Sequence, residues 1–503
     1  MQRWLAPDLA LAMGVVALFT SLFLFGGTER LFRDSDTGWH IRTGERILSG
    51  AGIPRTDPYS FSKPAGRWMA WEWASDAVMG WLHRACGMRG VAWLFGLAIG
   101  AGFWLWIRLS WRCGGDFLLA CAMLPALWTT AELHWLARPH VLGWLLLQAA
   151  LMTAESGLTV FRVRHGALAF AAGALWANVH GSFLLGLLVV SLYGLGEVIQ
   201  WLIWNSGDLR RAGWLARLML CASAGTLANP YGWELHRHVA GYLRDSELLS
   251  RVAEFQSFNF HTPGAAPVLA VLLLTLAGAG CALAQRNAGR GLVLLFFAVV
   301  AIRSARGLPL AAVCALPLAN GSLTLLLLRA RGLRPWLERG LAAFLAYSGN
   351  LRKIDARMSG VAAAAAAAGC AWLALGIPAV AARTGFAADQ FPVAAAQQVA
   401  ALPAGARILA PDKFGGYLIY RFHGERKVFF DGRSDYYGAA FMKRYLRLME
   451  ARPGWRDEVS KFEFTHALIP PDGALRAALE GSGWRRMYED RVAALLERPR
   501  GWQ

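Results

Sequence analysis

The feature that most constrains this chain is a series of apolar stretches, each about 18 residues long or longer, the length that crosses a bilayer as a helix. On this criterion we expect about eleven spans. The first runs from Leu9 to Phe25, and the others begin near Met88, Phe117, Pro139, Gly166, Ser182, Trp214, Pro267, Gly291, Leu308 and Gly360. No small-residue cleavage site follows the first span, so we expect a retained helix rather than a signal peptide. The pattern therefore predicts an all-α polytopic membrane protein.

The composition agrees with a membrane protein and narrows the choice of partners. Hydrophobic residues make up 56% of the chain, more than an ordinary soluble domain carries. The net charge of +18 would fit nucleic-acid binding if the basic residues formed one face, but they lie in short loops between apolar stretches. The positive-inside rule explains that distribution, so we expect a lipid bilayer and no nucleic acid among the partners. The seven Cys residues include no CxxC pair, so neither a thiolate metal site nor a disulfide framework is expected.

The basic loops also predict the orientation of the chain. One set of alternate loops contains Arg108 and Arg112, Arg162 and Arg164, Arg210 and Arg211, Arg286 and Arg290, and the segment 329–357. We expect these loops, and the amino terminus with them, to face the cytoplasm. The other loops are expected on the outer side: residues 26–87, 131–140, 178–181, 229–263, 302–307 and everything after 382.

Two domains are expected. Residues 1–382 form the transmembrane domain, with a long outer loop at 26–87, and residues 383–503 form a small α/β domain outside the membrane. In the second domain we expect strands at 407–410, 427–430 and 466–469, helices at 415–420, 438–449 and 473–479, and a last hairpin within 484–496. Strands that alternate with helices predict a sheet covered by helices.

Two carboxylates stand one residue apart directly after the first span, in Asp34-Ser35-Asp36, and His40 follows them. Ionisable groups at a membrane boundary are costly, so they indicate a functional site. Further polar residues of the outer loops fall on the same face of the membrane: Asp57, Glu72, Glu132, His134, Arg138, His140, Asn178, His180, Asn229, Glu254, Arg303 and Arg306. Convergence of carboxylates, imidazoles and guanidinium groups on one interface predicts an active site there.

Structural roles are an alternative for several of these residues. Asp34 and Asp36 fit a helix cap or a solvated loop, and Asp57 fits the turn chemistry of its Thr-Asp-Pro sequence. His40 fits three roles, which are to orient an aspartate, to bind a metal ion with both aspartates, or to support the fold. The sequence leaves these alternatives open.

The same choice arises for residues nearer the apolar stretches. Glu72 lies between two Trp residues and fits an interfacial helix, while Arg138 fits a side chain that snorkels to the membrane surface. Asn178 and His180 interrupt an apolar run, where a buried hydrogen bond between helices is the alternative to substrate binding.

The motifs and the expected architecture resemble the GT-C superfamily of integral membrane glycosyltransferases, which includes protein O-mannosyltransferases and the lipid A aminoarabinose transferase type. The resemblance rests on Asp34-Ser35-Asp36 after the first helix, the long outer loop, the many spans and the outer carboxyl-terminal domain. The stretch 38–61 is similar to that of uncharacterised bacterial members, as is Gly415-Gly416-Tyr417 followed by the segment 431–435. The Trp-Trp-Asp signature of oligosaccharyltransferase catalytic subunits does not occur in the chain.

This resemblance implies a glycosyltransferase of the bacterial cytoplasmic (inner) membrane, with the amino terminus inside and the carboxyl-terminal domain in the periplasm. The donor would be a sugar on a polyprenyl phosphate or diphosphate. The acceptor would be a glycan, a lipid or a protein at the outer face of the membrane.

The site residues then take expected roles. Asp36 is expected to act as the general base, and Asp34 to position the acceptor or a metal ion. Arg138, Arg303 and Arg306 are expected to hold the donor phosphate, because the positive-inside rule disfavours basic residues in outer loops and these three lie there. The other candidate substrate-binding residues are His40, Asp57, Glu72, His140, Asn178 and His180. A divalent cation, Mg²⁺ or Mn²⁺, would be held by Asp34, Asp36 and His40, although the sequence leaves metal dependence open.

Two other classes of protein fit part of the pattern. A transporter or flippase for a lipid-linked glycan would use the same basic groove without making a bond, but no clear internal repeat supports it. A non-enzymatic envelope scaffold would not depend on the paired carboxylates.

Overall fold

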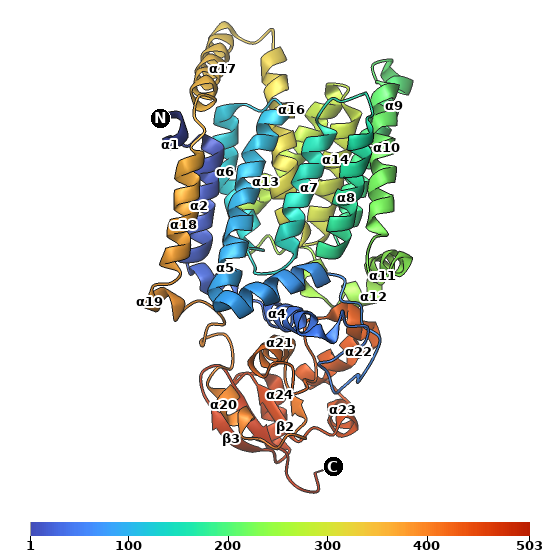
Figure 1. Ribbon diagram of the computed structural model, residues 1–503, viewed down its shortest axis with the longest axis vertical. Helices are drawn as coiled ribbons and strands as arrows, with labels where there is room; N and C mark the ends of the chain where they lie inside the picture. Colours follow the sequence, from blue (N-terminus) through green and yellow to red (C-terminus); the bar gives the residue numbers. More distant parts are fainter. Residues whose placement is uncertain (1, 503) are drawn as a thin grey trace.

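The computed structural model describes residues 2–502 and consists of a bundle of long helices with a small domain at one end (Figure 1). The helices of the bundle are α2 (Leu9–Phe23), α5 (Trp73–Arg112), α6 (Phe117–Glu132), α7 (His140–Ala154), α8 (Val163–Val179), α9 (Phe183–Trp204), α10 (Leu209–Thr226), α13 (Ala265–Ala284), α14 (Ala288–Arg303), α15 (Gly307–Leu310), the π-helical turn η3 (Ala311–Ala315), α16 (Leu316–Arg329) and α18 (Val361–Ala374). Short helices α1 (Gln2–Leu5) and α19 (Pro378–Ala381) lie near its edges.

Helices occupy each position at which the sequence predicts a span. By length and composition, four of the described segments are able to cross a membrane: Trp73–Arg112, Phe183–Trp204, Ala265–Ala284 and Gly307–Arg329. Shorter apolar helices are Leu9–Phe23, Phe117–Glu132, His140–Ala154 and Val361–Ala374. The protein is thus mostly helical, as expected for a membrane protein, and the count of eleven spans stays a prediction.

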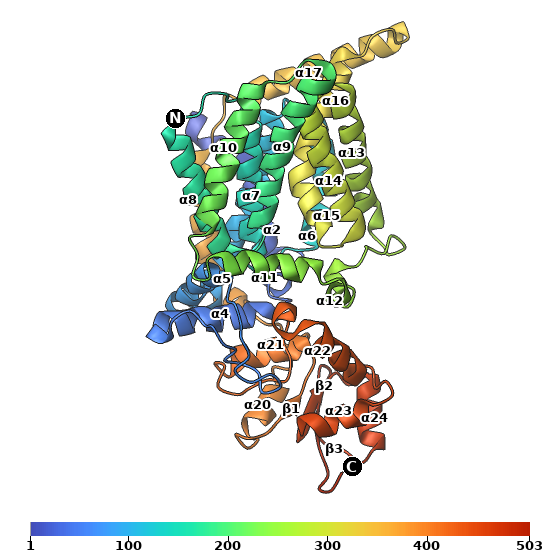
Figure 2. The same cartoon turned by 90° about the vertical axis from the view of Figure 1, so that its right-hand side faces the viewer.

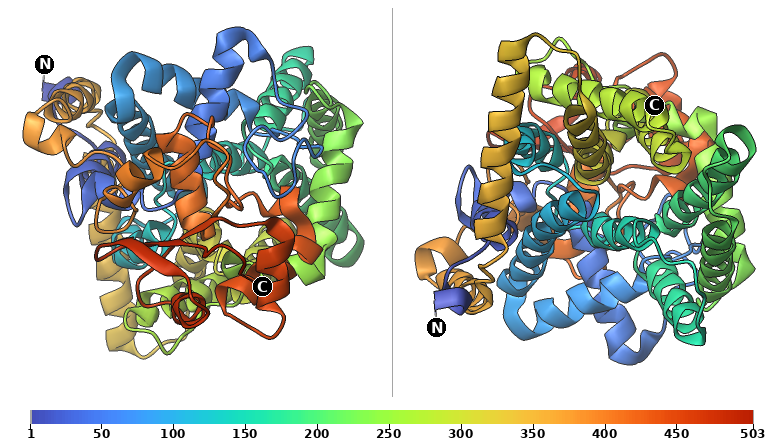
Figure 3. Two further views of the ribbon diagram at one scale, coloured as in Figure 1. Left: turned by 90° about the horizontal axis from the view of Figure 1, so that it is seen from below. Right: turned by 90° about the horizontal axis from the view of Figure 1, so that it is seen from above.

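The basic segment 329–357 and the carboxyl-terminal domain lie at opposite ends of the bundle. Most of the basic segment forms α17 (Pro335–Asp355), which runs along one edge of the bundle when seen from above (Figure 3). The carboxyl-terminal domain covers part of the other end (Figures 1 and 3). These two segments, which the charge pattern assigns to opposite sides of the membrane, therefore lie at opposite ends of the molecule.

A layer of short elements separates the bundle from the carboxyl-terminal domain (Figure 2). It contains α3 (Gly27–Leu31), α4 (Asp36–Arg46), the π-helical turn η1 (Ile47–Ala51), the first part of α5, α11 (Trp233–Arg244), α12 (Ser246–Leu249) and the turn η2 (Ala253–Phe255). The first part of α5 lies across the bundle because the chain bends at Gly87, which has a φ of 62° and a ψ of −157°. This layer consists largely of the predicted outer loop.

The carboxyl-terminal domain is a small four-stranded sheet with helices around it. Its strands are β1 (Ile408–Leu409), β2 (His466–Ile469), β3 (Arg485–Glu489) and β4 (Ala494–Glu497), in the order β1-β2-β4-β3. β1 and β2 are parallel, and the other two pairs are antiparallel. The helices are α20 (Ala395–Ala400), α21 (Asp412–Arg421), α22 (Ser434–Met449), α23 (Trp455–Phe462) and α24 (Ala474–Gly481).

One predicted strand, 427–430, is wrong. Val428 makes only an isolated parallel bridge, to Ser60 of the outer loop. The neighbouring backbone also bonds to the outer loop, since the carbonyl oxygen of Val428 accepts from the N–H of Phe61 and that of Phe429 accepts from the hydroxyl of Ser62. The segment therefore runs through the core beside the outer loop instead of joining the sheet.

The outer loop and the carboxyl-terminal domain share one hydrophobic core. Trp39, Tyr59 and Trp68 of the loop belong to the same buried cluster as the core of the domain. Backbones approach closely at this contact, because a Cβ atom on Gly38 of α4 would lie 2.6 Å from the carbonyl oxygen of Gly416 in α21. The position of α4 relative to the domain is thus set by backbone packing.

Candidate active site

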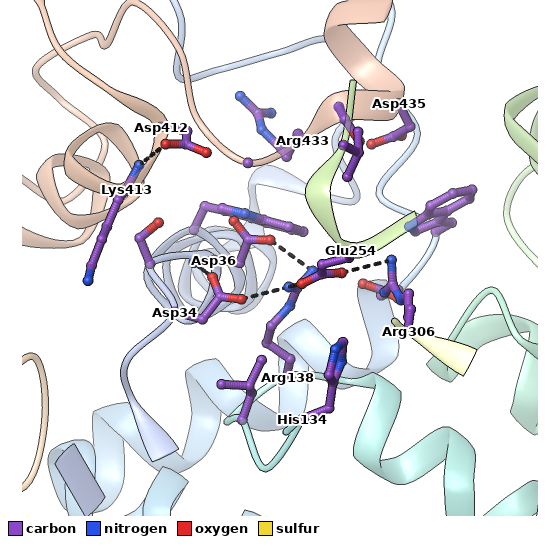
Figure 4. A pocket seen from close by; sticks show the side chains of 18 of the residues that line it. Asp34, Asp36, His134, Arg138, Glu254, Arg306, Asp412, Lys413, Arg433 and Asp435 are labelled. Carbon is purple, nitrogen blue, oxygen red and sulfur yellow. Dashed lines mark hydrogen bonds and ion pairs between the residues drawn. The ribbon is translucent and has the colours of Figure 1, made fainter. Parts of the chain in front are cut away.

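A cavity of about 590 Å³ lies where the bundle end, the outer loop and the carboxyl-terminal domain meet (Figure 4). Its lining comes from segments far apart in the sequence, and several aromatic side chains belong to it, including Trp39, Trp68, Trp71 and Tyr242. Its ionisable lining residues are Arg33, Asp34, Asp36, Glu72, Asp76, His134, Arg138, Glu254, Arg306, Asp412, Lys413, Arg433 and Asp435. A cavity of this size with convergent polar groups is the form a ligand site takes.

The two aspartates that follow the first helix hold a single guanidinium group (Figure 4). Arg138 lies 2.7 Å from Asp34 Oδ2 through Nη1 and 2.8 Å from Asp36 Oδ2 through Nη2. Asp34 Oδ1 also accepts a hydrogen bond from the backbone N–H of Asp36, at 2.9 Å, and so supports the first turn of α4. Arg33, the sequence neighbour of Asp34, donates through its guanidinium to the carbonyl oxygens of Glu132 and Leu133.

Asp36 is the aspartate best suited to accept a proton near neutral pH. Burial raises the pKa of its carboxyl group, Arg138 lowers it and the charge of Asp34 raises it again, with a net result of about 7. The other carboxylate oxygen, Oδ1, faces Gly432 of the carboxyl-terminal domain, where a Cβ atom would lie only 2.0 Å away. The domain therefore forms the wall against which this carboxylate rests.

A second ion pair lines the cavity beside the first. Arg306 lies 3.4 Å from Glu254 and over the ring of Phe255, and Glu254 also lies 3.6 Å from Arg138. Burial would raise the pKa of Glu254, but the charges of Arg306 and Arg138 outweigh it and lower the pKa to about 2. Arg303 is exposed and is not among the residues that line the cavity.

Glu72 links the cavity to a buried polar chain. Its carboxylate lies 3.3 Å from His180 Nε2 and 3.7 Å from His40 Nε2, and His40 Nδ1 lies 2.6 Å from Asp76 Oδ1. This contact is possible because α4 and α5 pack backbone against backbone, with a Cβ on Gly44 only 1.7 Å from the Asp76 carbonyl oxygen. Burial raises the pKa of Glu72 to about 7, and burial with the charge of Arg138 holds the pKa of His40 well below its usual range.

Three predicted site residues have structural contacts instead. Asp57 accepts hydrogen bonds from the backbone N–H groups of Tyr59 and Ser60. Asn178 accepts a hydrogen bond from the Trp73 indole at 2.6 Å and donates to the carbonyl oxygen of Ala174 in its own helix and to that of Ala228 in the loop after α10. His140 donates through Nε2 to the carbonyl oxygen of His134 at 2.9 Å. None of the three lines the cavity. The turn alternative describes the contacts of Asp57, and the interhelical alternative describes the contact of Asn178 with Trp73.

The residues expected to hold a divalent cation do not come together. Asp34 and Asp36 contact the guanidinium of Arg138, whereas His40 is directed toward Asp76 and Glu72. Within residues 2–502, no group of three or more His, Cys, Asp or Glu side chains is arranged to hold a metal ion. The donor set of Asp34, Asp36 and His40 therefore does not fit such an ion.

Sequence reasoning missed two groups of lining residues. Asp76 follows Glu72 by four residues in a helical segment, a spacing that places both on one face and that offered a signal. The carboxyl-terminal domain contributes Lys413 and Asp435, which no local pattern assigned to the site. It also contributes Arg433, for which the sequence allowed either a strand-end turn or a position that faces the cleft.

Arg433 is held in place within this domain. It makes paired contacts of 2.7 Å with Asp431 and one of 2.8 Å with Asp57, and it lies over the ring of Trp68. Only the packing of the domain against the outer loop brings it to the cavity.

No model of a protein family and no curated protein sequence matches this chain. Among solved structures, the chain is similar to the oligosaccharyltransferase of Archaeoglobus fulgidus in the apo form, with a TM-score of 0.50. The match is 12% identical in sequence and covers 98% of this chain and 74% of the archaeal one. At this identity the likeness concerns the fold alone, so the chain is similar in fold to this archaeal protein.

Proposed function

We propose that the protein is a glycosyltransferase that moves a sugar from a polyprenyl phosphate or diphosphate to an acceptor at the outer face of the cytoplasmic membrane. The observation that carries this proposal is Asp36, whose buried carboxyl group lines a cavity of about 590 Å³ and has a pKa of about 7. The fold supports it, because the similar archaeal protein is an oligosaccharyltransferase.

In the proposed reaction, Asp36 is the general base. The acceptor hydroxyl oxygen forms a bond to the anomeric carbon of the sugar, and its proton passes to the Asp36 carboxylate. The bond from that carbon to the phosphate oxygen breaks, and the phosphate leaves with the electron pair. Asp34 is the weaker candidate for the base, because its two oxygens already take the Asp36 backbone N–H and Arg138.

The leaving phosphate needs cations in place of a proton. Of the three arginines expected to bind it, Arg306 keeps that role in this proposal, since it lines the cavity and contacts a single carboxylate at 3.4 Å. Arg138 is engaged by Asp34 and Asp36, and Arg303 does not line the cavity. Lys413 lines the cavity from the domain side and is the second candidate for phosphate binding.

The orientation belongs to the same proposal. The basic segment 329–357 would face the cytoplasm, and the cavity with residues 383–503 would lie in the periplasm, because positive loops are retained inside. The bundle, residues 1–382, would give the polyprenyl chain of the donor access from the bilayer. The acceptor would then reach Asp36 from the aqueous side.

Comparison of lipid extracts from cells with and without the protein tests the proposal whichever sugar is transferred. Cells that lack the protein should accumulate a polyprenyl-linked sugar that mass spectrometry detects, and the wild-type chain should remove it. Asp36→Asn should fail to do so, because loss of a general base costs roughly a hundredfold to ten-thousandfold in rate.

The matched control is Asp472→Asn, which changes an aspartate of the carboxyl-terminal domain that does not line the cavity to the same amide. It should behave as the wild-type chain does. If Asp36→Asn removes the lipid as fast as the wild type while both are present at equal amounts in the membrane, Asp36 is not the base. If no polyprenyl-linked sugar changes in any strain, the transferase proposal itself is wrong.

A further inference from the structure

Three carboxylates from two segments that are far apart in the sequence converge on the guanidinium of Arg138 (Figure 4). Asp34 precedes α4, Asp36 opens it, and Glu254 lies in η2, at 2.7, 2.8 and 3.6 Å from the terminal nitrogens of Arg138. The Arg138 side chain is only 16% exposed. A buried arginine surrounded in this way is paired within the protein before any substrate binds.

The backbone around Arg138 fixes it at this position. The N–H of Ala137 donates to the carbonyl oxygen of Leu31 at 2.9 Å, and Thr37 Oγ1 donates to the carbonyl oxygen of Ala137 at 3.0 Å. These two bonds tie the loop before α7 to both α3 and α4. Pro139, which follows directly, further restricts the backbone of Arg138.

The geometry suits a guanidinium group. Its two terminal nitrogens point N–H groups in fixed directions, so one planar group satisfies two carboxylates at once. A divalent cation in the same place would need the oxygens that these N–H groups occupy, at about 2.0–2.6 Å from the metal. The carboxylates that would bind a metal ion are therefore committed to Arg138.

We propose that Arg138 is the resident cation of this cavity and occupies the place between Asp34, Asp36 and Glu254 that a divalent metal ion would otherwise take. Because an arginine keeps its charge throughout the working pH range, the cavity holds a fixed positive charge beside Asp36. Arg138 is then a positioning residue, which orients Asp34 and Asp36, and not the phosphate ligand expected from the sequence.

Removal of the guanidinium should convert the cluster into a metal site. In Arg138→Ala, the three carboxylates would face vacated space with unbalanced charge, and carboxylates are the ligands that hard divalent cations prefer. We expect the purified full-length variant in detergent to bind one Mn²⁺ saturably, measured by the loss of the free-ion signal in electron paramagnetic resonance. The wild-type protein should show no such binding, and neither should Arg138→Lys, which keeps a cation in place.

Two further variants assign the signal to the cluster. Mn²⁺ binding should disappear again when Asp34→Asn and Asp36→Asn are added to Arg138→Ala. Arg303→Ala, which removes an exposed arginine that is not part of the cavity lining, should behave as the wild type does. Size-exclusion chromatography of each variant shows whether the chain is folded and monodisperse.

Two outcomes would overturn the proposal. One is saturable Mn²⁺ binding by the wild-type protein that Asp36→Asn abolishes, and this test needs no Arg138 variant. The other is a folded Arg138→Ala protein that binds no Mn²⁺. The part of this proposal in which Arg138 positions a catalytic base rests on the proposed function, whereas its part as the cation of the cavity does not. Because Mn²⁺ binding is read without sugar transfer, a failure of the proposed function would leave these measurements unchanged.

Discussion

Substitution of Gly432 tests whether the carboxyl-terminal domain sets the position of the proposed base. A Cβ atom at this residue would lie 2.0 Å from Asp36 Oδ1 and 2.8 Å from its Cγ, whereas real Cβ contacts essentially never fall below 3.0 Å. The backbone of Gly432 is not in the left-handed region, so alanine is compatible with its conformation. In Gly432→Ala, the carboxylate or the loop must therefore shift by about 1 Å.

A shift of this size has a predictable cost. Asp36 has little freedom, since its other oxygen lies 2.8 Å from Arg138. Misplacement of a catalytic group by about 1 Å costs roughly a hundredfold in rate, which corresponds to about 3 kcal/mol of transition-state stabilisation. We expect kcat to fall by about that factor, while the protein remains folded because the substitution adds one methyl group.

The assay is the initial rate of sugar transfer in proteoliposomes, with the thermal unfolding temperature measured on the same preparation. Gly405→Ala is the matched control, because it lies in the same domain and a Cβ there would meet no atom within 4 Å. It should leave both the rate and the unfolding temperature unchanged. A folded Gly432→Ala protein with a rate within about twofold of the wild type would refute the reasoning, since so small a change is below about 0.5 kcal/mol.

Two further predictions concern the same cavity. Because the pKa of Asp36 is about 7, the proposed base is protonated at lower pH, so kcat/KM should rise with pH through about 7. The pKa of Glu72 is also about 7, so Glu72→Gln separates the two carboxyl groups. This variant should keep the rise in kcat/KM if Asp36 causes it. Arg306→Lys keeps the charge but loses the planar fork, so the KM for the donor should rise by roughly tenfold with little change in kcat. Arg303→Lys, which alters an exposed arginine, should leave the KM for the donor unchanged. If both variants have the same KM, Arg306 does not bind the phosphate.

The periodic parts of this fold could be predicted from the sequence. Helices begin close to the expected positions because apolar runs of span length admit few alternatives. The strands at 408–409 and 466–469 and the last hairpin also lie where their patterns predict them. The strand expected at 427–430 failed for a physical reason: its backbone pairs with the outer loop at Ser60, and a contact with so distant a segment leaves no mark in the local pattern.

The location of the site could be predicted from the outer loops, but the contacts between its residues could not. Asp34 and Asp36 could be predicted because a pair of ionisable residues directly after an apolar helix indicates a functional site, and both line the cavity. Their partner Arg138 was assigned to the donor phosphate, since spacing alone cannot show that three carboxylates converge on it. Asp57 and Asn178 share the chemistry of site residues, yet their hydrogen bonds go to the local backbone and to the helices.

The close contact between Gly38 and Gly416 has a consequence for how the protein is made. Asp36 is synthesised among the first residues of the chain, but the wall that confines it, at Gly432 and Arg433, is synthesised after the bundle. A nascent chain therefore carries the Asp36 carboxylate without this wall until the last segment is translated and docks on α4. The cavity is in this way completed only at the end of translation, so under the proposed function an incomplete chain would not consume a donor.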